Sequence, residues 1–152
     1  MYIESEHLSN WIEKGRATPL PVASSRSFDE YLCTLPWGPS RLDWHSIPFS
    51  SFDYQENGWS GQSAVDWAKS NRLLDSTHAF IMYSASEPGI LCSATDAFYE
   101  LDYLTMGRVH PAYICAAVQG EEGPVLSFER FAEWDGFSAV MTPLSSGCTR
   151  MA

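Results

Sequence analysis

Basic residues are scarce in this sequence. Its 152 residues include nine lysines and arginines against nineteen aspartates and glutamates, which gives a formal net charge of −10 at pH 7. A surface with this excess of negative charge repels phosphate backbones and anionic lipid headgroups over the Debye length. We therefore expect no direct nucleic-acid partner, and a basic protein is the natural complement of such a chain.

Long apolar runs are also missing. The longest candidate, "AYICAAV" at 112–118, is far short of the ~20 residues that a membrane-spanning helix needs. The first fifteen residues carry glutamates and a tryptophan, where a secretory signal would have a basic end followed by an apolar segment. We expect a soluble protein of the cytoplasm that has no membrane partner.

Clustered cysteines and the short motifs of cofactor enzymes are absent as well. The chain contains no C-x-x-C pair, no P-loop, no G-x-G-x-x-G, no G-x-S-x-G and no H-E-x-x-H. These absences indicate reduced thiols, no zinc site and no cofactor. The cysteines are widely scattered: Cys33, Cys92, Cys115 and Cys148. Three histidines lack a metal-ligand partner three or four residues away and are read as structural: His7, His45 and His78.

Apolar and aromatic residues are present at the level of a folded domain, 45% and 14% of the chain. The length predicts one globular domain over residues 1–144, followed by a flexible tail at 145–152. Helical spacing of apolar residues predicts five helices, at 4–14, 27–35, 60–74, 93–107 and 124–136. Apolar runs predict strands at 78–84, 90–92, 112–118 and 137–144.

Alternating helices and strands favour an α+β fold, with α/β as the alternative. We expect a single domain with a central sheet of about three to five strands, packed with four to five helices. Two helix starts carry capping-box spacing, Ser27 with Glu30 and Ser93 with Asp96. The stretch at 36–61 is rich in aromatics, prolines and glycines, and its regular structure stays open. Its aromatics either anchor a loop on the core or form a contact surface.

Cys92 has two interpretations. It lies where the strand at 90–92 meets a helix, and a helix N-terminus can lower the pKa of a thiol. With His110 as the base, Cys92 would be the nucleophile of a small hydrolase or transferase. Cysteine peptidases of the papain-like architecture are similar in placing a cysteine at a helix start and a histidine on a later strand. The other interpretation, which we favour, is that Cys92 is a small apolar core residue.

Negative charge concentrates in the second half of the chain. Between Glu87 and Asp135 there are nine carboxylates and two arginines, or −7. Acidic residues mixed with aromatics suit binding to a basic protein, because charge speeds the encounter and buried aromatics hold the complex. The same charge on a plain solvated surface would only keep the protein in solution. The predicted binding face consists of Glu121, Glu122, Glu129, Glu133, Trp134 and Asp135.

In its small size, acidity and lack of enzyme motifs, the chain resembles the immunity proteins with which bacteria neutralise a cognate toxin. The resemblance implies a single-domain inhibitor that is not an enzyme and that occludes the toxin's active site with carboxylates. Two alternatives stay open: the cysteine hydrolase or transferase, and a non-catalytic subunit of a larger assembly with 37–59 as its interface. The oligomeric state is not predicted.

Overall fold

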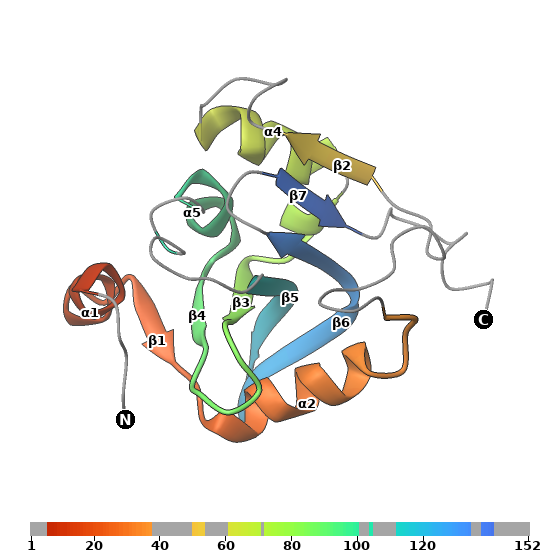
Figure 1. Ribbon diagram of the computed structural model, residues 1–152. Helices are drawn as coiled ribbons and strands as arrows, with labels where there is room; N and C mark the ends of the chain where they lie inside the picture. Colours follow the sequence, from red (N-terminus) through yellow and green to blue (C-terminus); the bar gives the residue numbers. More distant parts are fainter. Residues whose placement is uncertain are drawn as a thin grey trace.

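The computed structural model describes residues 6–37, 50–53, 61–70, 72–100, 104, 112–134 and 138–141. Within this part of the chain, seven strands form one antiparallel sheet in the order β1-β4-β3-β5-β6-β7-β2. Helices lie on both sides of the sheet (Figure 1). The strands are β1 (Ala17–Pro19), β2 (Ser50–Asp53), β3 (His78–Met82), β4 (Ile90–Ser93), β5 (Ala112–Gly120), β6 (Gly123–Trp134) and β7 (Ser138–Met141). The helices are α1 (Glu6–Glu13), α2 (Val22–Leu32), α4 (Gly61–Ser70), the 3₁₀ helix η2 (Leu73–Asp75) and α5 (Ala94–Tyr99).

This architecture is the predicted α+β fold with a larger sheet than expected. The seven strands of the described residues exceed the predicted three to five. Two of the additional strands, β1 and β2, are short segments of three and four residues at the two edges of the sheet. Segments of this length carry too little alternation of apolar and polar residues to be recognised in a sequence. The predicted tail at 145–152 lies outside the described residues.

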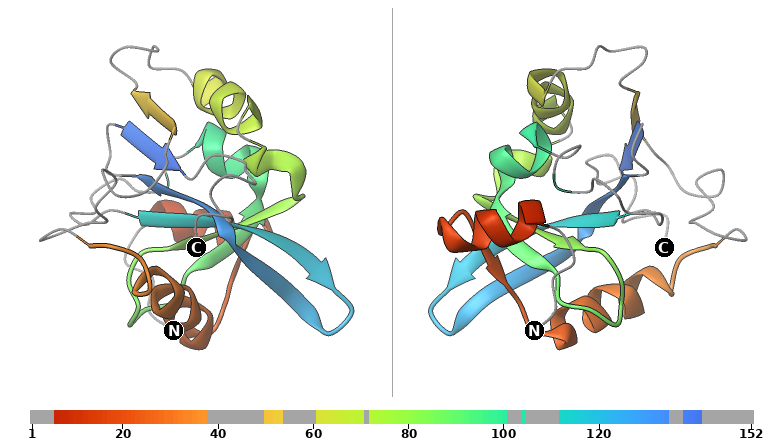
Figure 2. Two further views of the ribbon diagram at one scale, coloured as in Figure 1. Left: turned by 90° about the vertical axis from the view of Figure 1, so that its right-hand side faces the viewer. Right: turned by 60° about the vertical axis from the view of Figure 1, so that its left-hand side comes forward.

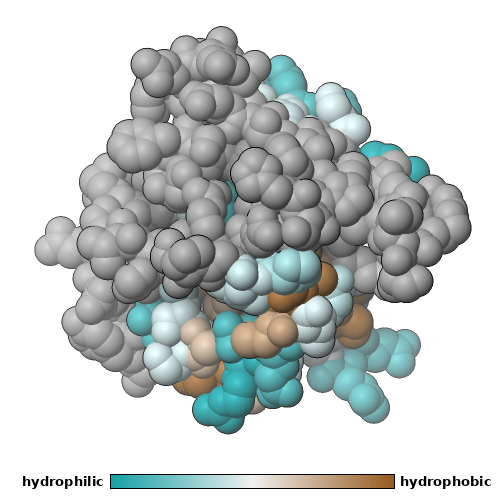
Figure 3. Space-filling view, turned by 45° about the vertical axis from the view of Figure 1, so that its right-hand side comes forward, coloured by the Kyte–Doolittle hydropathy of each residue, from teal (hydrophilic) through white to brown (hydrophobic). Residues whose placement is uncertain are grey.

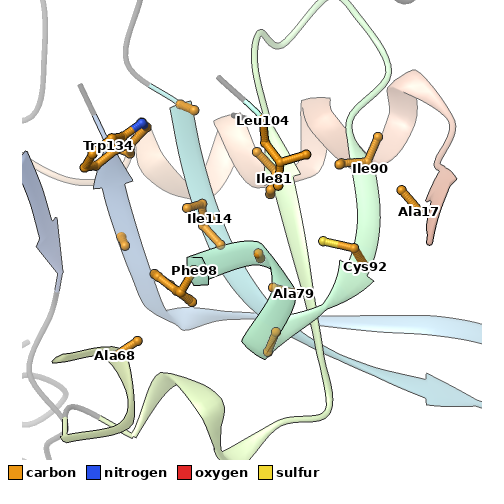
Figure 4. Close-up of a cluster of buried hydrophobic side chains, with 14 of the residues drawn as sticks. Ala17, Ala68, Ala79, Ile81, Ile90, Cys92, Phe98, Leu104, Ile114 and Trp134 are labelled. Carbon is orange, nitrogen blue, oxygen red and sulfur yellow. The ribbon is translucent and has the colours of Figure 1, made fainter. Parts of the chain in front are cut away.

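The sheet separates two clusters of buried apolar side chains, because successive residues of a strand point to opposite faces. On one side, α1, α4 and α5 contribute Trp11, Ala68 and Phe98 to a cluster that includes Ala79 and Ile81 of β3 (Figure 4). On the other side, Phe28 and Leu32 of α2 pack, together with Leu20, on alternate residues of the strands: Phe80, Met82, Leu91, Tyr113, Cys115 and Phe131. Both faces of the central strands are therefore buried, which explains why β5 has a continuous apolar run in the sequence.

The segment 124–136 is predicted as a helix, but its described residues, 124–134, belong to strand β6. Phe128 and Phe131 have helical spacing, but they belong to β6. The register between β5 and β6 shifts so that Cys115 faces Phe131 while Ala116 faces Ser127, which leaves three extra residues on β6. This bulge turns both phenylalanines toward α2, where the ring centroids of Phe128 and Phe131 lie 5.2 and 6.3 Å from that of Phe28. Phe128 and Phe131 therefore lie on the same side of a bulged strand, although their spacing of three residues is typical of a helix.

The second predicted helix begins earlier than expected. We predicted a start at Ser27, but α2 begins at Val22, and its N-cap is Pro21 with no side-chain cap. Proline is tolerated at a helix start because the first N–H groups have no partner within the helix. The Ser25 hydroxyl then donates a hydrogen bond of 2.8 Å to the carbonyl of Glu87, which ties α2 to the β3–β4 turn.

The predicted cap at Ser93 is confirmed. Its side chain accepts a hydrogen bond from the backbone N–H of Asp96 at 3.4 Å, at the first turn of α5. The described helix ends at Tyr99, and of the remaining predicted segment up to residue 107 only Glu100 and Leu104 are described. The cap places α5 directly after β4, with Ala97 and Phe98 buried against the sheet.

Candidate functional site

The residues predicted to form an acidic binding face do not share one surface. Glu121 and Glu122 are exposed, whereas Glu133 and Trp134 have exposed fractions of 0% and 1%. The prediction of an exposed position is therefore wrong for Glu133 and Trp134, because their part of β6 runs through the interior of the sheet. The side chain of Glu129 is not among those described, and Asp135 lies outside the described residues.

Glu133 is satisfied within the protein. The Tyr113 hydroxyl donates a hydrogen bond of 2.5 Å to its Oε2 atom from the neighbouring strand, where the two residues are direct partners. A buried carboxylate needs such donors, because burial without them is costly. Tyr113 in turn packs against the ring of Trp37, with centroids 6.1 Å apart. Glu133 therefore belongs to an internal polar contact and is not available to a partner.

The exposed pair of glutamates lies at the end of a projecting β-hairpin. β5 and β6 pair as far as Gly120 and Gly123, and Glu121 and Glu122 form the two-residue turn between them. Gly123 has φ +128, a conformation that favours glycine. Residues 118–126, which we call the hairpin arm, project from the body of the molecule in both views of Figure 2. The β3 pairing of β5 ends at Ala117, opposite His78, so β3 does not extend along the arm.

The hairpin arm also carries an exposed apolar pair. Val118 and Val125 are direct partners across the two strands, and their exposed fractions are 42% and 54%. Facing residues of an antiparallel pair have their Cβ atoms about 5 Å apart and point to the same face. The arm therefore presents two adjacent valines beside its acidic turn.

On the face of the molecule shown in Figure 3, apolar and hydrophilic side chains are intermixed among the described residues. The other large exposed apolar side chains among the described residues are Trp37 and Tyr99. The Trp37 side chain is fixed by a hydrogen bond: its indole Nε1 donates to the carbonyl of Leu32 at 2.9 Å. Most of the aromatic stretch at 37–59 lies outside the described residues, so its role as an interface stays a prediction.

Cys92 occupies the interior of the sheet. It is opposite Ala17 on β1 and Ala79 on β3, and it has an exposed fraction of 2%. Its side chain points into the cluster of buried apolar residues (Figure 4). Burial, reinforced by the nearby Asp96 carboxylate, raises the pKa of the Cys92 thiol to about 12, although Arg16 opposes the shift. A nucleophile needs the reverse, so the geometry favours packing, and His110 lies outside the described residues.

A surface pocket of about 370 Å³ lies at the end of the sheet where β3 begins and β4 ends. Four strands and two other segments contribute to its lining. Among its polar residues are Arg16, Thr18, His78, Ser93, Asp96 and Gln119. This set could not be recognised in the sequence, because its members come from distant parts of the chain with no common spacing. The one local signal was the Ser93–Asp96 cap.

No family model matches the sequence, and no curated protein or solved structure is similar enough to match it. Among the described residues, no three histidine, cysteine, aspartate or glutamate side chains come together as metal ligands. The helices of the described part are all too short or too polar to span a bilayer. The function has to be inferred from the placement of side chains alone.

Proposed function

We propose that this protein is a non-catalytic inhibitor of a basic protein partner, acting in the cytoplasm in the manner of an immunity protein. The observation that carries the proposal is the hairpin arm, which combines Glu121 and Glu122 with the exposed Val118–Val125 pair. A projecting, narrow element of this kind fits a cleft in a partner. If that cleft is an active site, the two carboxylates can take the place of an anionic substrate.

The two parts of the hairpin arm have different physical roles. The glutamates, together with the net charge of −10, attract a basic partner and raise the association rate, and salt weakens this effect. The valines supply apolar area that leaves water on binding, which stabilises the complex by about 1 kcal/mol for each half-exposed side chain. Attraction of the partner and stability of the complex therefore come from neighbouring residues of one hairpin.

The first experiment is the capture of partners from lysate of the source organism on tagged protein, with washes of low and then high salt. The expected result is one basic protein that is released by salt. Mixing the purified partner with this protein should then abolish the partner's activity. Binding without loss of activity would contradict inhibition, and the absence of any salt-sensitive partner would contradict the proposal as a whole.

The role of the arm is tested by a matched pair of double variants. Glu121→Lys/Glu122→Lys and Glu13→Lys/Glu30→Lys each change the net charge from −10 to −6, because each replacement adds two charges. All four glutamates are exposed. The arm variant should lower affinity at least about tenfold, whereas the control should change mainly the association rate and by less. Equal effects of the two variants would contradict the assignment to the arm.

A further inference from the structure

The pocket beside the hairpin arm has a chemistry of its own. Leu91 of β4 and Thr18 of β1 are among its lining residues, and they are direct partners across the strands. Ser93 and His78 are partners in the next pair of strands and add polar groups to the same face. Gln119, at the base of the arm, adds an amide. A concave site with a few convergent polar groups is typical of small-molecule binding.

The polar groups include several hydrogen-bond donors. His78 has its Nδ1 atom 2.8 Å from the Thr77 hydroxyl, and its Nε2 atom is the second polar atom of the ring. Arg16 carries five N–H donors, and the hydroxyls of Thr18 and Ser93 can each donate one. A ligand rich in acceptors, such as a carboxylate, matches this lining.

One charge of each sign borders the pocket. Nη2 of Arg16 lies 3.6 Å from Oδ2 of Asp96, and the two side chains are 42% and 44% exposed. This separation is longer than a direct hydrogen bond, so both groups keep hydrogen-bonding capacity. Arg16 is held in place by Trp11, with its Cζ atom 4.1 Å from the ring centroid. The chain as a whole has a net charge of −10, but at this pocket the positive charge of Arg16 balances the negative charge of Asp96.

The geometry points to a binding site for a small zwitterion, an α-amino acid, with its carboxylate on Arg16 and its ammonium group on Asp96. The hydroxyls and the Gln119 amide then face the ligand's remaining polar atoms. The volume of about 370 Å³ is at the small end of ligand pockets, which suits a molecule of this size. The inference goes beyond the proposed function, because it assigns a ligand that binds without any protein partner.

The test is a titration of the purified protein with the twenty free amino acids, followed by calorimetry or by NMR of backbone amides. We expect at least one amino acid to bind at millimolar concentration or below. Its N-acetyl derivative, which lacks the ammonium group and resembles a peptide C-terminus, should bind about tenfold more weakly or worse. The C-terminal amide, which lacks the carboxylate, should do the same.

Two variants assign the binding to the pocket. Arg16→Met should lower affinity about tenfold or more, and Arg26→Met is the matched control, because Arg26 is an exposed residue of α2. If Arg16→Met disturbs folding through Trp11, Gln119→Glu on the exposed arm is the second variant: it adds a negative charge to the lining of the pocket, which repels the ligand's carboxylate and should weaken binding likewise. Absence of binding by all twenty amino acids, or affinity unchanged in Arg16→Met or in the N-acetyl derivative, would overturn the inference.

Discussion

The Tyr113 hydroxyl donates a 2.5 Å hydrogen bond to the Glu133 carboxylate across β5 and β6, where both side chains are buried. This contact turns an acidic residue, which the sequence alone places at the surface, into part of the core. It also links the strand that carries one side of the hairpin arm to the strand that carries the other. The body of the sheet is thereby held together below the projecting turn.

Replacing Tyr113 by Phe should destabilise the protein. The variant removes one donor from a buried carboxylate, and a hydrogen bond to a charged group contributes about 1.5–3 kcal/mol. Urea unfolding of both proteins measures the difference. Tyr99→Phe is the control, because Tyr99 is 51% exposed and its loss should cost less than about 0.5 kcal/mol. A Tyr113→Phe variant as stable as the control would show that the contact contributes little.

The Cys92 thiol should resist alkylation in the native protein. Its pKa of about 12 leaves almost no thiolate at neutral pH, and its burial excludes the reagent. Iodoacetamide followed by peptide mass spectrometry should show labelling of exposed Cys33 and none of Cys92 until the chain is unfolded. Rapid native labelling of Cys92 would revive the hydrolase alternative.

Stability should fall as the pH rises above about 9. Burial raises the pKa of both the Cys92 and Cys115 thiols, so the folded state retains protons that the unfolded chain loses near the ordinary value of 9.0. The stabilisation is complete below that pH and is lost progressively toward about 12.

The measurement is the midpoint of urea unfolding at pH 8, 9 and 10 for the native protein and for Cys92→Ala/Cys115→Ala. Because other groups also titrate in this range, the slope against pH is compared and not the stability itself. The double variant should have the shallower slope. Identical slopes would contradict the assignment of this pH dependence to the two thiols.

Gly89 should not tolerate a side chain. A Cβ atom there would collide with the backbone carbonyl of Ile81 and would lie 2.7 Å from Cζ of Phe80. Both neighbours are buried, so Gly89→Ala should cost about 2–3 kcal/mol in the free energy of unfolding. Gly15→Asn is the control, because Gly15 has φ +74 with nothing near its Cβ position, and asparagine accepts that conformation. Similar small effects at both positions would contradict the steric explanation.

Local features of the sequence determined local structure. The apolar run at 112–118 predicted a buried strand, and residues 112–117 are buried in β5. The Ser93–Asp96 spacing predicted the cap of α5. These predictions succeed because the hydrogen bonds and conformations involved lie within a few residues of one another. The acidic balance of the chain is likewise a property of composition alone.

Only the tertiary structure decided which side chains are available for function. Phe128 and Phe131 fit a helix by their spacing, but pairing with β5 and packing on Phe28 make their segment a bulged strand. The sequence predicts that Glu133 is exposed, but in the fold it is buried opposite Tyr113 and accepts its hydrogen bond. Arg16 and Asp96 border one pocket although eighty positions separate them in the chain. A short segment is often compatible with more than one local structure, and contacts between distant residues decide which one forms. The hairpin arm and the pocket depend on such contacts, so they could not be predicted from the sequence.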